Sequence, residues 1–315
     1  MKVLITGGAG FIGSHLARRS LALGHDVAVL DDLSTGRRRN LDEVMADLEF
    51  FEGDIRNPSD VEQAIAGCDA VLHQAALPSV PRSIACPADS HEVNATGTLN
   101  VLIAARDAGV QRFVLASSSS VYGSTPGLPK KEEMPTLPLS PYAVAKCAAE
   151  SYARSFHGVY GLETVGLRYF NVFGPRQDPQ SEYAAVVPRF IAAFRAGEAP
   201  VICGDGEQSR DFTYVENVVD ANMAALVSEA APGRVYNIAC GERITLNQLV
   251  HGLRQQIGTS VEPVHGPPRP GEVRHSMADV SRAREDLGYE PRIGLAEGLS
   301  RTVDHFSAES MEAVA

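Results

Sequence analysis

Hydrophobic and polar positions alternate along the first half of the chain in a rhythm typical of a parallel sheet covered by helices on both faces. Short β-branched runs are separated by longer stretches with helical spacing of apolar residues. The predicted strands are Lys2–Thr6, Asp26–Asp31, Glu49–Gly53, Ala70–Gln74, Phe113–Ser117 and Thr164–Arg168. The predicted helices are Phe11–Leu23, Ser59–Ala66, Asn94–Ala108 and Tyr142–Tyr160. This order predicts an α/β fold with a Rossmann-like, doubly wound parallel sheet.

The pattern changes after Asn171, where proline and glycine clusters break the alternation into shorter elements. Apolar periodicity still predicts helices at Val186–Phe194, Val218–Leu226 and Leu246–Ile257. We therefore expect a nucleotide-binding domain over residues 1–171, onto which part of 211–240 could pack back. A smaller, mixed substrate domain would occupy 172–315, with Ser307–Ala315 as a frayed tail.

A glycine-rich turn, Gly7–Gly13, lies between the first predicted strand and the first predicted helix. In that context backbone N–H groups and the helix dipole can face a pyrophosphate. Asp31 ends the second strand, where a carboxylate can accept hydrogen bonds from an adenosine ribose. Together these features favour a bound dinucleotide over a turn that is merely tight. Because Asp31 and Asp32 would repel the 2′-phosphate of NADP, we expect NAD, and we expect Arg37–Arg39 to form a solvated turn.

Candidate catalytic groups follow in the same half. Tyr142 and Lys146 are spaced so that both lie on one helix face. A nearby cation favours a phenolate and can lower the pKa of the phenol by about a unit or more, which suits a general base. The serine run Ser117–Ser120 ends the fifth strand at the sheet edge where ligands collect. Each pattern alone could be a solvated pair or an ordinary loop; their order after the glycine turn favours a catalytic site.

Composition limits the partners. The 315 residues are 44% hydrophobic, which suffices for a sizeable core, and the net charge of −11 disfavours nucleic acid and anionic membranes. The sequence shows neither a signal-peptide pattern nor a membrane-length apolar run, so we expect a cytoplasmic protein. The five cysteines lack metal-ligand spacing. We expect reduced thiols and no metal site.

The ordered set of motifs resembles the extended short-chain dehydrogenase/reductase family and, within it, the nucleotide-sugar 4-epimerases. The resemblance covers nearly the whole chain. Besides the glycine turn and the Tyr142/Lys146 pair, it is carried by Asp31–Thr35, Gly53–Ile55, His73–Ala76, Asn94, Ser117–Gly123, Arg168–Asn171, Gly174–Arg176, Ser209–Asp211 and Arg269–Glu272. It implies NAD as cofactor, a UDP-sugar substrate, and a homodimer joined through the Asn94–Ala108 and Tyr142–Tyr160 helices.

The resemblance also assigns roles. Tyr142 would be the base, Lys146 would tune its pKa and anchor the nicotinamide ribose, and Ser118 would bind the sugar O4. The cofactor residues that it implies are Gly7, Gly10, Phe11, Ile12, Gly13, Asp31, Asp32, Ser34, Thr35, Gly36, Asp54, Ile55, Gln74, Ala75, Ala76, Asn94, Ser117, Tyr142, Lys146 and Tyr169. The substrate residues are Ser79, Ser118, Ser119, Tyr142, Asn171, Val186, Val187, Val201, Cys203, Gln208, Arg210, Arg269, Glu272 and Ser276.

The serine run helps to choose the reaction. Related 4,6-dehydratases carry acids where this chain has Ser119 and Ser120, and related decarboxylases carry Glu at the position of Ser120. A hydroxyl near its normal pKa cannot replace those acids. The expected reaction is epimerisation at C4 through a 4-keto sugar: Tyr142 takes the O4 proton, hydride passes to NAD, and the ketone accepts it on its other face. A dehydratase-like lyase and a non-catalytic NAD-binding protein remain as alternatives.

The resemblance places Asn171, Arg210 and Arg269 on the diphosphate and Glu272 on the uridine ribose; an arginine fork suits phosphate oxygens. Ser276 stands where several glucose-restricted epimerases carry a tyrosine. The expected substrates are therefore UDP-GlcNAc/UDP-GalNAc and/or UDP-glucose/UDP-galactose. UDP-glucuronate remains an alternative, disfavoured because Asp178 would repel its carboxylate if it faced the pocket.

Overall fold

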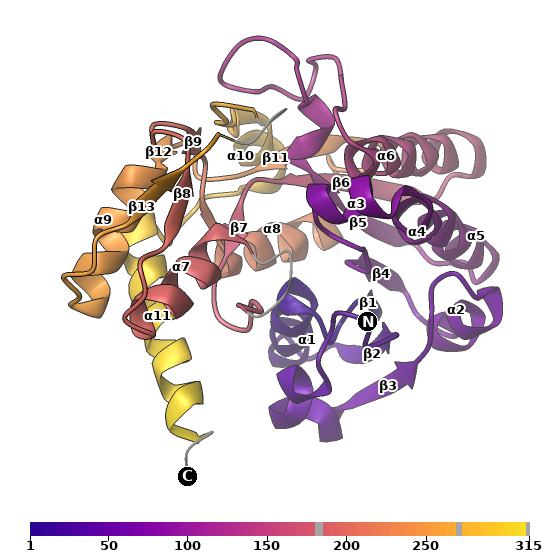
Figure 1. Cartoon of the computed structure of the whole chain (residues 1–315). Coiled ribbons are helices and arrows are strands. Elements are labelled where there is room, and N and C mark those ends of the chain that lie inside the picture. Colours follow the sequence, from indigo (N-terminus) through magenta and orange to yellow (C-terminus); the bar gives the residue numbers. More distant parts are fainter. Residues whose placement is uncertain (180–184, 269–272, 313–315) are drawn as a thin grey trace.

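A seven-stranded sheet forms the centre of the protein, seen in a computed structural model that describes residues 1–179, 185–268 and 273–312. The strand order is β11-β6-β5-β4-β1-β2-β3, and every neighbouring pair is parallel (Figure 1). The strands are β1 Lys2–Thr6, β2 Asp26–Asp31, β3 Leu48–Glu52, β4 Ala70–His73, β5 Arg112–Ser118, β6 Glu163–Tyr169 and β11 Val235–Ile238. The doubly wound α/β fold is confirmed. The order reverses between β1 and β4, and ligands of such sheets bind at this switch point.

Helices cover both faces of the sheet, so consecutive strand residues are buried on opposite sides. Val3 and Ile5 of β1 belong to one apolar cluster, and Leu4 between them belongs to another. The first cluster packs under α1 (Phe11–Ala22), α8 (Val215–Val227) and α10 (Ser281–Leu287). The second packs under α2 (Pro58–Ile65), α5 (Thr98–Asp107) and α6 (Pro141–Tyr160). Parallel strands buried on both faces account for their continuous apolar runs.

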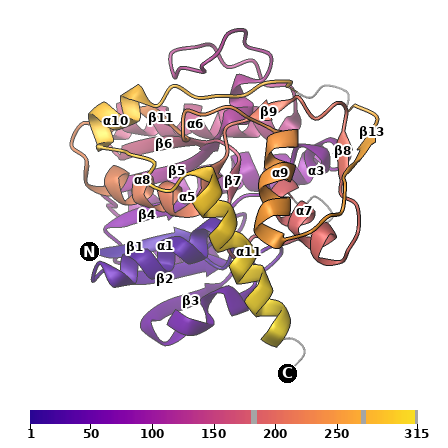
Figure 2. The ribbon, with the colours of Figure 1, turned by 90° about the vertical axis from the view of Figure 1, so that its left-hand side faces the viewer.

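A third apolar cluster holds the C-terminal elements together. Both views show α7 and α9 side by side, with α11 beside α9 (Figures 1 and 2). These helices are α7 Val186–Arg195, α9 Leu246–Ile257 and α11 Leu295–Glu312. The short strands pair as β7 Val172–Phe173 with β10 Thr213–Tyr214, β9 Ser209–Arg210 with β12 Ile244–Thr245, and β8 Val201–Cys203 with β13 Val264–Gly266. Among the described residues, no helix is long and apolar enough to cross a membrane.

Most predicted elements lie within three residues of their predicted bounds, but some expectations were wrong. The predicted helix Asn94–Ala108 starts with a π-helical turn, η2 (Glu92–Gly97), before α5. The hydroxyl of Thr98 donates to the Asn94 carbonyl there, at 2.9 Å, and so competes for a backbone acceptor. The fourth predicted strand ends at His73, one residue before Gln74, and the third at Glu52.

The C-terminus is the largest correction. Instead of a frayed tail from Ser307, helix α11 continues to Glu312. Leu299, Val303 and Phe306 recur at helical spacing and are buried in the third apolar cluster, which stabilises the helix. The sequence analysis also missed β11, because Val235–Ile238 is only four residues long and contains a polar position, Asn237.

Further short elements were missed as well. They are α3 (Val80–Ala85), α4 (Pro87–His91), η1 (Arg38–Asp47), η3 (Ser119–Tyr122) and α10. These segments are too short or too polar for periodicity to indicate a helix.

Candidate active site

A cavity of about 1400 Å³ opens at the carboxyl ends of the central strands, at the switch point. The glycine turn, the ends of β2, β4 and β5, and the first turns of α6 line it, and the segment after β7 borders it. Pockets for one small ligand usually measure roughly 300–1000 Å³, so this cavity has room for a dinucleotide and a second ligand. A smaller cavity of about 200 Å³ adjoins it and shares Asn171, Val172, Ala185 and Arg210 with it.

The glycine turn fits a dinucleotide pyrophosphate. Gly7 has a φ of +69°, and a Cβ there would lie 2.7 Å from the Ala75 nitrogen. A Cβ on Gly13 would lie 2.1 Å from the Gly7 oxygen. Within the described residues no side chain caps the start of α1 at Gly10, so the first N–H groups of the helix remain available to an anion at the cavity wall. Only glycines allow the backbone segments of the turn to pack this closely against one another beside the cavity.

Asp31 shapes the adjoining part of the cavity. Its two carboxylate oxygens accept hydrogen bonds from the Ala9 and Leu33 N–H groups, each at 2.9 Å. Burial raises the pKa of this carboxyl, and the backbone bonds oppose the shift. The Asp32 carboxylate in turn accepts from the N–H and the hydroxyl of Ser34, at 3.0 and 2.7 Å. The loop after β2 is therefore held by the same two acids that were expected to bind the ribose.

The helix pair Tyr142 and Lys146 lies on the cavity wall as the spacing predicts. Ser140 caps α6 by accepting from the Ala143 N–H at 3.2 Å. The Lys146 Nζ lies 5.9 Å from the centre of the Tyr142 ring and donates to the Ala116 carbonyl at 2.9 Å. Lys146 is only 2% exposed, and burial lowers its pKa to about 8. Its ammonium is thus desolvated yet still largely charged at neutral pH.

The surroundings of Tyr142 shift the pKa of its phenol in opposite directions. Burial raises this pKa, and a hydrogen bond with Ser118 lowers it. The Lys146 Nζ is directed to the Ala116 carbonyl. The role of Tyr142 as the base stays a prediction.

The serine run lies where β5 ends. The Ser118 hydroxyl accepts from the Ser120 N–H at 3.2 Å and starts η3, while Ser117 donates to Glu150 at 2.5 Å. All four serines line the cavity. Within the described part of the chain, the Ser120 hydroxyl is buried without a hydrogen-bond partner.

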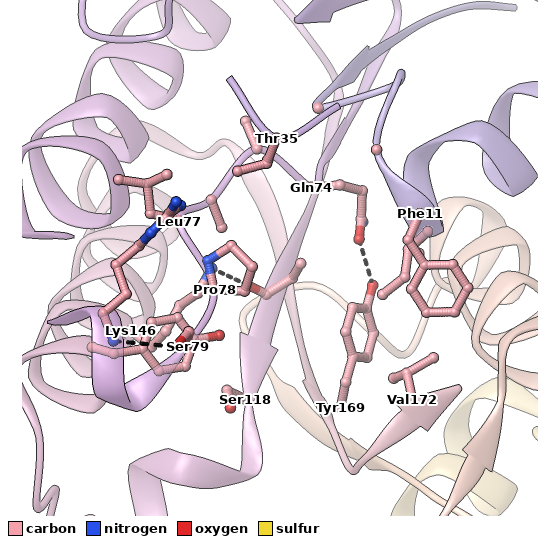
Figure 3. Close-up of a pocket in the computed structure, with 18 of the residues that line it drawn as sticks. Phe11, Thr35, Gln74, Leu77, Pro78, Ser79, Ser118, Lys146, Tyr169 and Val172 are labelled. Carbon is pink, nitrogen blue, oxygen red and sulfur yellow. Dashed lines mark hydrogen bonds between the residues drawn. The ribbon is translucent and has the colours of Figure 1, made fainter. Parts of the chain in front are cut away.

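Tyr169 and Asn94 have structural contacts. The Tyr169 hydroxyl donates to the Gln74 side-chain oxygen at 3.2 Å and accepts from the Asn222 amide at 2.9 Å, and burial raises its pKa to about 12. In Figure 3 it faces Gln74 beside Phe11, on the other side of the view from Lys146. Asn94 is fully buried and is not part of the cavity wall; its amide bonds both the N–H and the carbonyl of Leu77, at 3.0 and 3.1 Å. It therefore fixes a wall residue.

The remaining expected cofactor residues all lie on the cavity wall. They are Gly7, Gly10, Phe11, Ile12, Gly13, Asp31, Asp32, Ser34, Thr35, Gly36, Asp54, Ile55, Gln74, Ala75, Ala76 and Ser117. Of the expected substrate residues, the main cavity brings together Ser79, Ser118, Ser119, Tyr142, Asn171, Arg210 and Ser276. Val186, Val187, Val201, Cys203 and Gln208 line the smaller cavity, together with Asn171 and Arg210. Arg269 and Glu272 lie outside the described residues.

The sequence analysis missed an ion pair at the cavity mouth. Arg37 donates to the Asp178 carboxylate at 2.6 Å, and both residues line the cavity. The expectation of a wholly solvated basic turn was therefore wrong for Arg37. Next to Asp178, Arg176 pairs with Glu43 of η1 at 3.2 Å. Nothing in the sequence indicates which distant acid an arginine will meet, so only the fold reveals this contact.

Comparisons with known proteins agree with this architecture. The family model described as "NAD dependent epimerase/dehydratase family" matches residues 3–239. The UDP-glucose 4-epimerase of Mycolicibacterium smegmatis is 42% identical over 98% of this chain and 100% of its own length. Two solved structures, each 40% identical, cover 98% of the chain. They are the UDP-N-acetylglucosamine 4-epimerase of Methanobrevibacter ruminantium with UDP-N-acetylmuramic acid (98% of that chain, TM-score 0.93) and the UDP-glucose 4-epimerase of Thermus thermophilus with NAD (99%, TM-score 0.90).

Proposed function

Because the chain belongs to the NAD-dependent epimerase/dehydratase family, we propose that it interconverts the C4 epimers of a UDP-hexose. The observation that carries the proposal is the grouping of Tyr142, Lys146 and Ser118 at the switch point, flanked by Ser119 and Ser120. The first three supply a base, a cation and a hydroxyl for the O4 atom. The last two are hydroxyls, which cannot act as the acid and base that removal of water from C5 and C6 requires.

The residues of this chain perform the proton part of the reaction. Tyr142 accepts the O4 proton, and its hydrogen bond with Ser118 favours the ionised phenol. Lys146 stays largely charged at neutral pH and adds a positive charge beneath the ring. When bound, NAD⁺ supplies a hydride acceptor, which later returns the hydride, and a further positive charge that favours the phenolate. The desolvated site strengthens each of these interactions.

The cavity residues that fit NAD divide by chemistry. Gly7, Gly10 and Gly13 line the cavity at the start of α1, where the helix N–H groups suit a pyrophosphate. Asp31 and Asp32 lie at the end of β2, where acceptors for the adenosine ribose hydroxyls are expected. The same carboxylates oppose a 2′-phosphate, and the nearby Arg37 already pairs with Asp178. These observations support NAD rather than NADP.

The choice of sugar rests on the other end of the cavity. Ser276 lines it and is small enough to leave space for a 2-acetamido group. An enlarged pocket rejects a smaller ligand by only about 1–3 kcal/mol, so we propose both the GlcNAc/GalNAc and the glucose/galactose pairs as substrates. UDP-glucuronate remains the second candidate, because the pairing of Asp178 with Arg37 neutralises the charge that would repel its carboxylate.

The surface of α6 supports a homodimer as the assembly. Val144, Tyr152 and Val159 recur at helical spacing along α6 and are exposed. Ile103 of the neighbouring α5 is exposed as well. An apolar stripe across adjacent helices is typical of a buried contact, and we propose that α5 and α6 of two copies form it.

A direct assay tests the reaction. Purified protein is mixed with UDP-GlcNAc, UDP-glucose or UDP-glucuronate without added NAD, and the anomeric proton signals are followed by NMR. We expect the C4 epimer to appear for the first two, and we expect Tyr142→Phe to lower kcat by about 10²–10⁴-fold. An unchanged sugar in all three samples, with NAD bound to the protein, would overturn the proposal. An alkali-absorbing 4-keto-6-deoxy product would favour a lyase instead.

A further inference from the structure

A buried pair of charges lies behind Lys146. Glu150 follows Lys146 by one turn of α6, and its side chain is 9% exposed. The Arg168 side chain, on β6, is 5% exposed. Its guanidinium forms two parallel bonds to the Glu150 carboxylate, at 2.9 and 2.7 Å. Two-point arginine pairs of this kind fix the position of the carboxylate.

Other contacts lock the pair in place. The Ser117 hydroxyl at the end of β5 donates to Glu150 at 2.5 Å. The Arg168 guanidinium lies over the Tyr122 ring at 4.8 Å, and its Nη1 donates to the Glu132 carbonyl at 3.4 Å. The Glu150 carboxylate thus connects three elements, α6, β5 and β6. The Glu150–Arg168 pair is therefore a buried pair held by further contacts, unlike an exposed ion pair on the surface.

Among the groups that act on Lys146, Glu150 is the one that carries a negative charge. From α6 it meets Tyr142 and Glu150, and from β5 the Ala116 carbonyl. From β4 it meets His73, whose ring bonds the hydroxyls of Thr6 and Thr98, and burial lowers the pKa of His73 to about 3. His73 is therefore neutral. Glu150 is the negative group whose field acts on Lys146.

We propose that Glu150, held by Arg168, is a positioning residue that keeps Lys146 protonated inside the site. Without Glu150, Lys146 and Arg168 would be two buried cations that have both lost the anion acting on them. The cheapest response of such a site is loss of the lysine proton, since arginine does not give up its own. Only one part of this inference rests on the proposed function, namely that the charge on Lys146 favours the phenolate of Tyr142.

The lysine content of the chain makes the idea directly testable. There are only four lysines, Lys2, Lys130, Lys131 and Lys146, so NMR of lysine-labelled protein resolves each titration. The Lys146 signal is assigned by its loss in Lys146→Met. In Glu150→Gln we expect the pKa of Lys146 to fall by about a unit or more relative to the unchanged protein.

A matched control is available at the other end of the same two strands. Glu163 of β6 accepts from Arg112 of β5 at 3.0 and 2.7 Å. Glu163→Gln removes an arginine pair that also has two bonds and has a half-exposed carboxylate, away from the cavity wall, and should leave the Lys146 titration where it was. A shift of similar size in Glu163→Gln, or an unmoved Lys146 in Glu150→Gln, would overturn the proposal.

Two further variants keep the test decisive if Glu150→Gln folds poorly around an unpaired Arg168. Arg168→Met leaves Glu150 without its arginine and should raise the pKa of Lys146. Adding Glu150→Gln to it should lower the pKa of Lys146 again, because the carboxylate that acts on the ammonium is then gone. Equal Lys146 titrations in these two proteins would contradict the proposal. The measured quantity is the pKa of Lys146 and does not depend on activity. If that pKa shifts as expected in a protein that epimerises no sugar, the proposed function is refuted and this inference is not.

Discussion

At the residue scale, the cavity wall holds a charged group whose burial lowers the free energy of unfolding. Lys146 shows this most clearly, because its ammonium is desolvated and its hydrogen-bond acceptor is a backbone carbonyl of β5. Its folded pKa of about 8 lies below the ordinary value of a lysine. A charged group that is buried for the sake of ligand binding lowers the stability of the ligand-free protein.

This leads to a prediction for Lys146→Met. Between pH 8 and 10.5 the unfolded chain binds more protons than the folded one, so stability rises with pH across that window and the cost of the buried charge is complete below pH 8. That cost is on the order of 3 kcal/mol. After subtraction of the lost bond to Ala116, we expect the variant to be about 1–2 kcal/mol more stable than the parent at pH 7. Urea unfolding of cofactor-free protein measures this, and the advantage should shrink towards pH 10. A less stable variant at pH 7 would count against it.

A second prediction concerns two helical glycines. A Cβ at Gly13 would collide with the Gly7 oxygen at 2.1 Å, so Gly13→Ala must distort the turn. We expect NAD affinity to fall by about tenfold or more, which corresponds to a loss of roughly 1.4 kcal/mol or more of binding free energy. Gly158 of α6 has open space around its Cβ position and is the matched control. Gly158→Ala should stabilise the protein by about 0.5–1 kcal/mol and leave NAD binding alone. Fluorescence titration and thermal unfolding give both values.

At the element scale, the sequence predicts the long helices and strands whose apolar residues recur at regular spacing. Leu246–Ile257 was predicted to the residue, because Thr245 and Gln248 cap it and Gly258 ends it in a left-handed conformation. β11 was missed because a four-residue strand is decided by the partner that it pairs with, here β6. The candidate pair Tyr142 and Lys146 could be found from spacing. The pairing of Glu150 with Arg168, eighteen residues away on β6, could not.

The loop elements at the cavity mouth carry a third prediction. The Arg37–Asp178 pair joins the loop after β2 to the segment after β7 across the expected NAD site. Both side chains are partly exposed, so the contact is worth about 0.2–1 kcal/mol. We therefore expect Asp178→Asn to speed the loss of bound NAD about two- to fivefold, measured by NAD fluorescence after dilution. Glu262→Gln, which breaks the exposed Arg254 pair on the far elements, should not alter the rate. Equal release from both variants would exclude a role for the contact.

At the scale of the whole molecule, the central sheet and the C-terminal elements border two adjoining cavities. The sheet with its helices supplies the glycine turn and the Tyr142 helix, while the elements gathered around α7 and α9 supply the smaller adjoining cavity. The change of pattern after Asn171 predicts two domains, which stays a prediction, but it does not indicate that residues 174–179 contact the loop after β2 and η1. Contacts between distant segments depend on the assembled fold, which composition and periodicity do not encode.

The last prediction concerns assembly. The exposed stripe on α6 includes Tyr152, and two copies meeting there would bury an aromatic side chain at the centre of the contact. We expect the protein to elute at twice its chain mass of 33.6 kDa in size-exclusion chromatography with light scattering. Tyr152→Glu should shift it to the single-chain mass at micromolar concentration, because an uncompensated charge at such a centre costs about 2–5 kcal/mol. Val227 of α8 is another exposed apolar residue, on a helix other than α5 and α6, and Val227→Glu should leave the mass unchanged. A single-chain mass for the unmodified protein, or a dimer that tolerates Tyr152→Glu, would place the contact elsewhere or remove it.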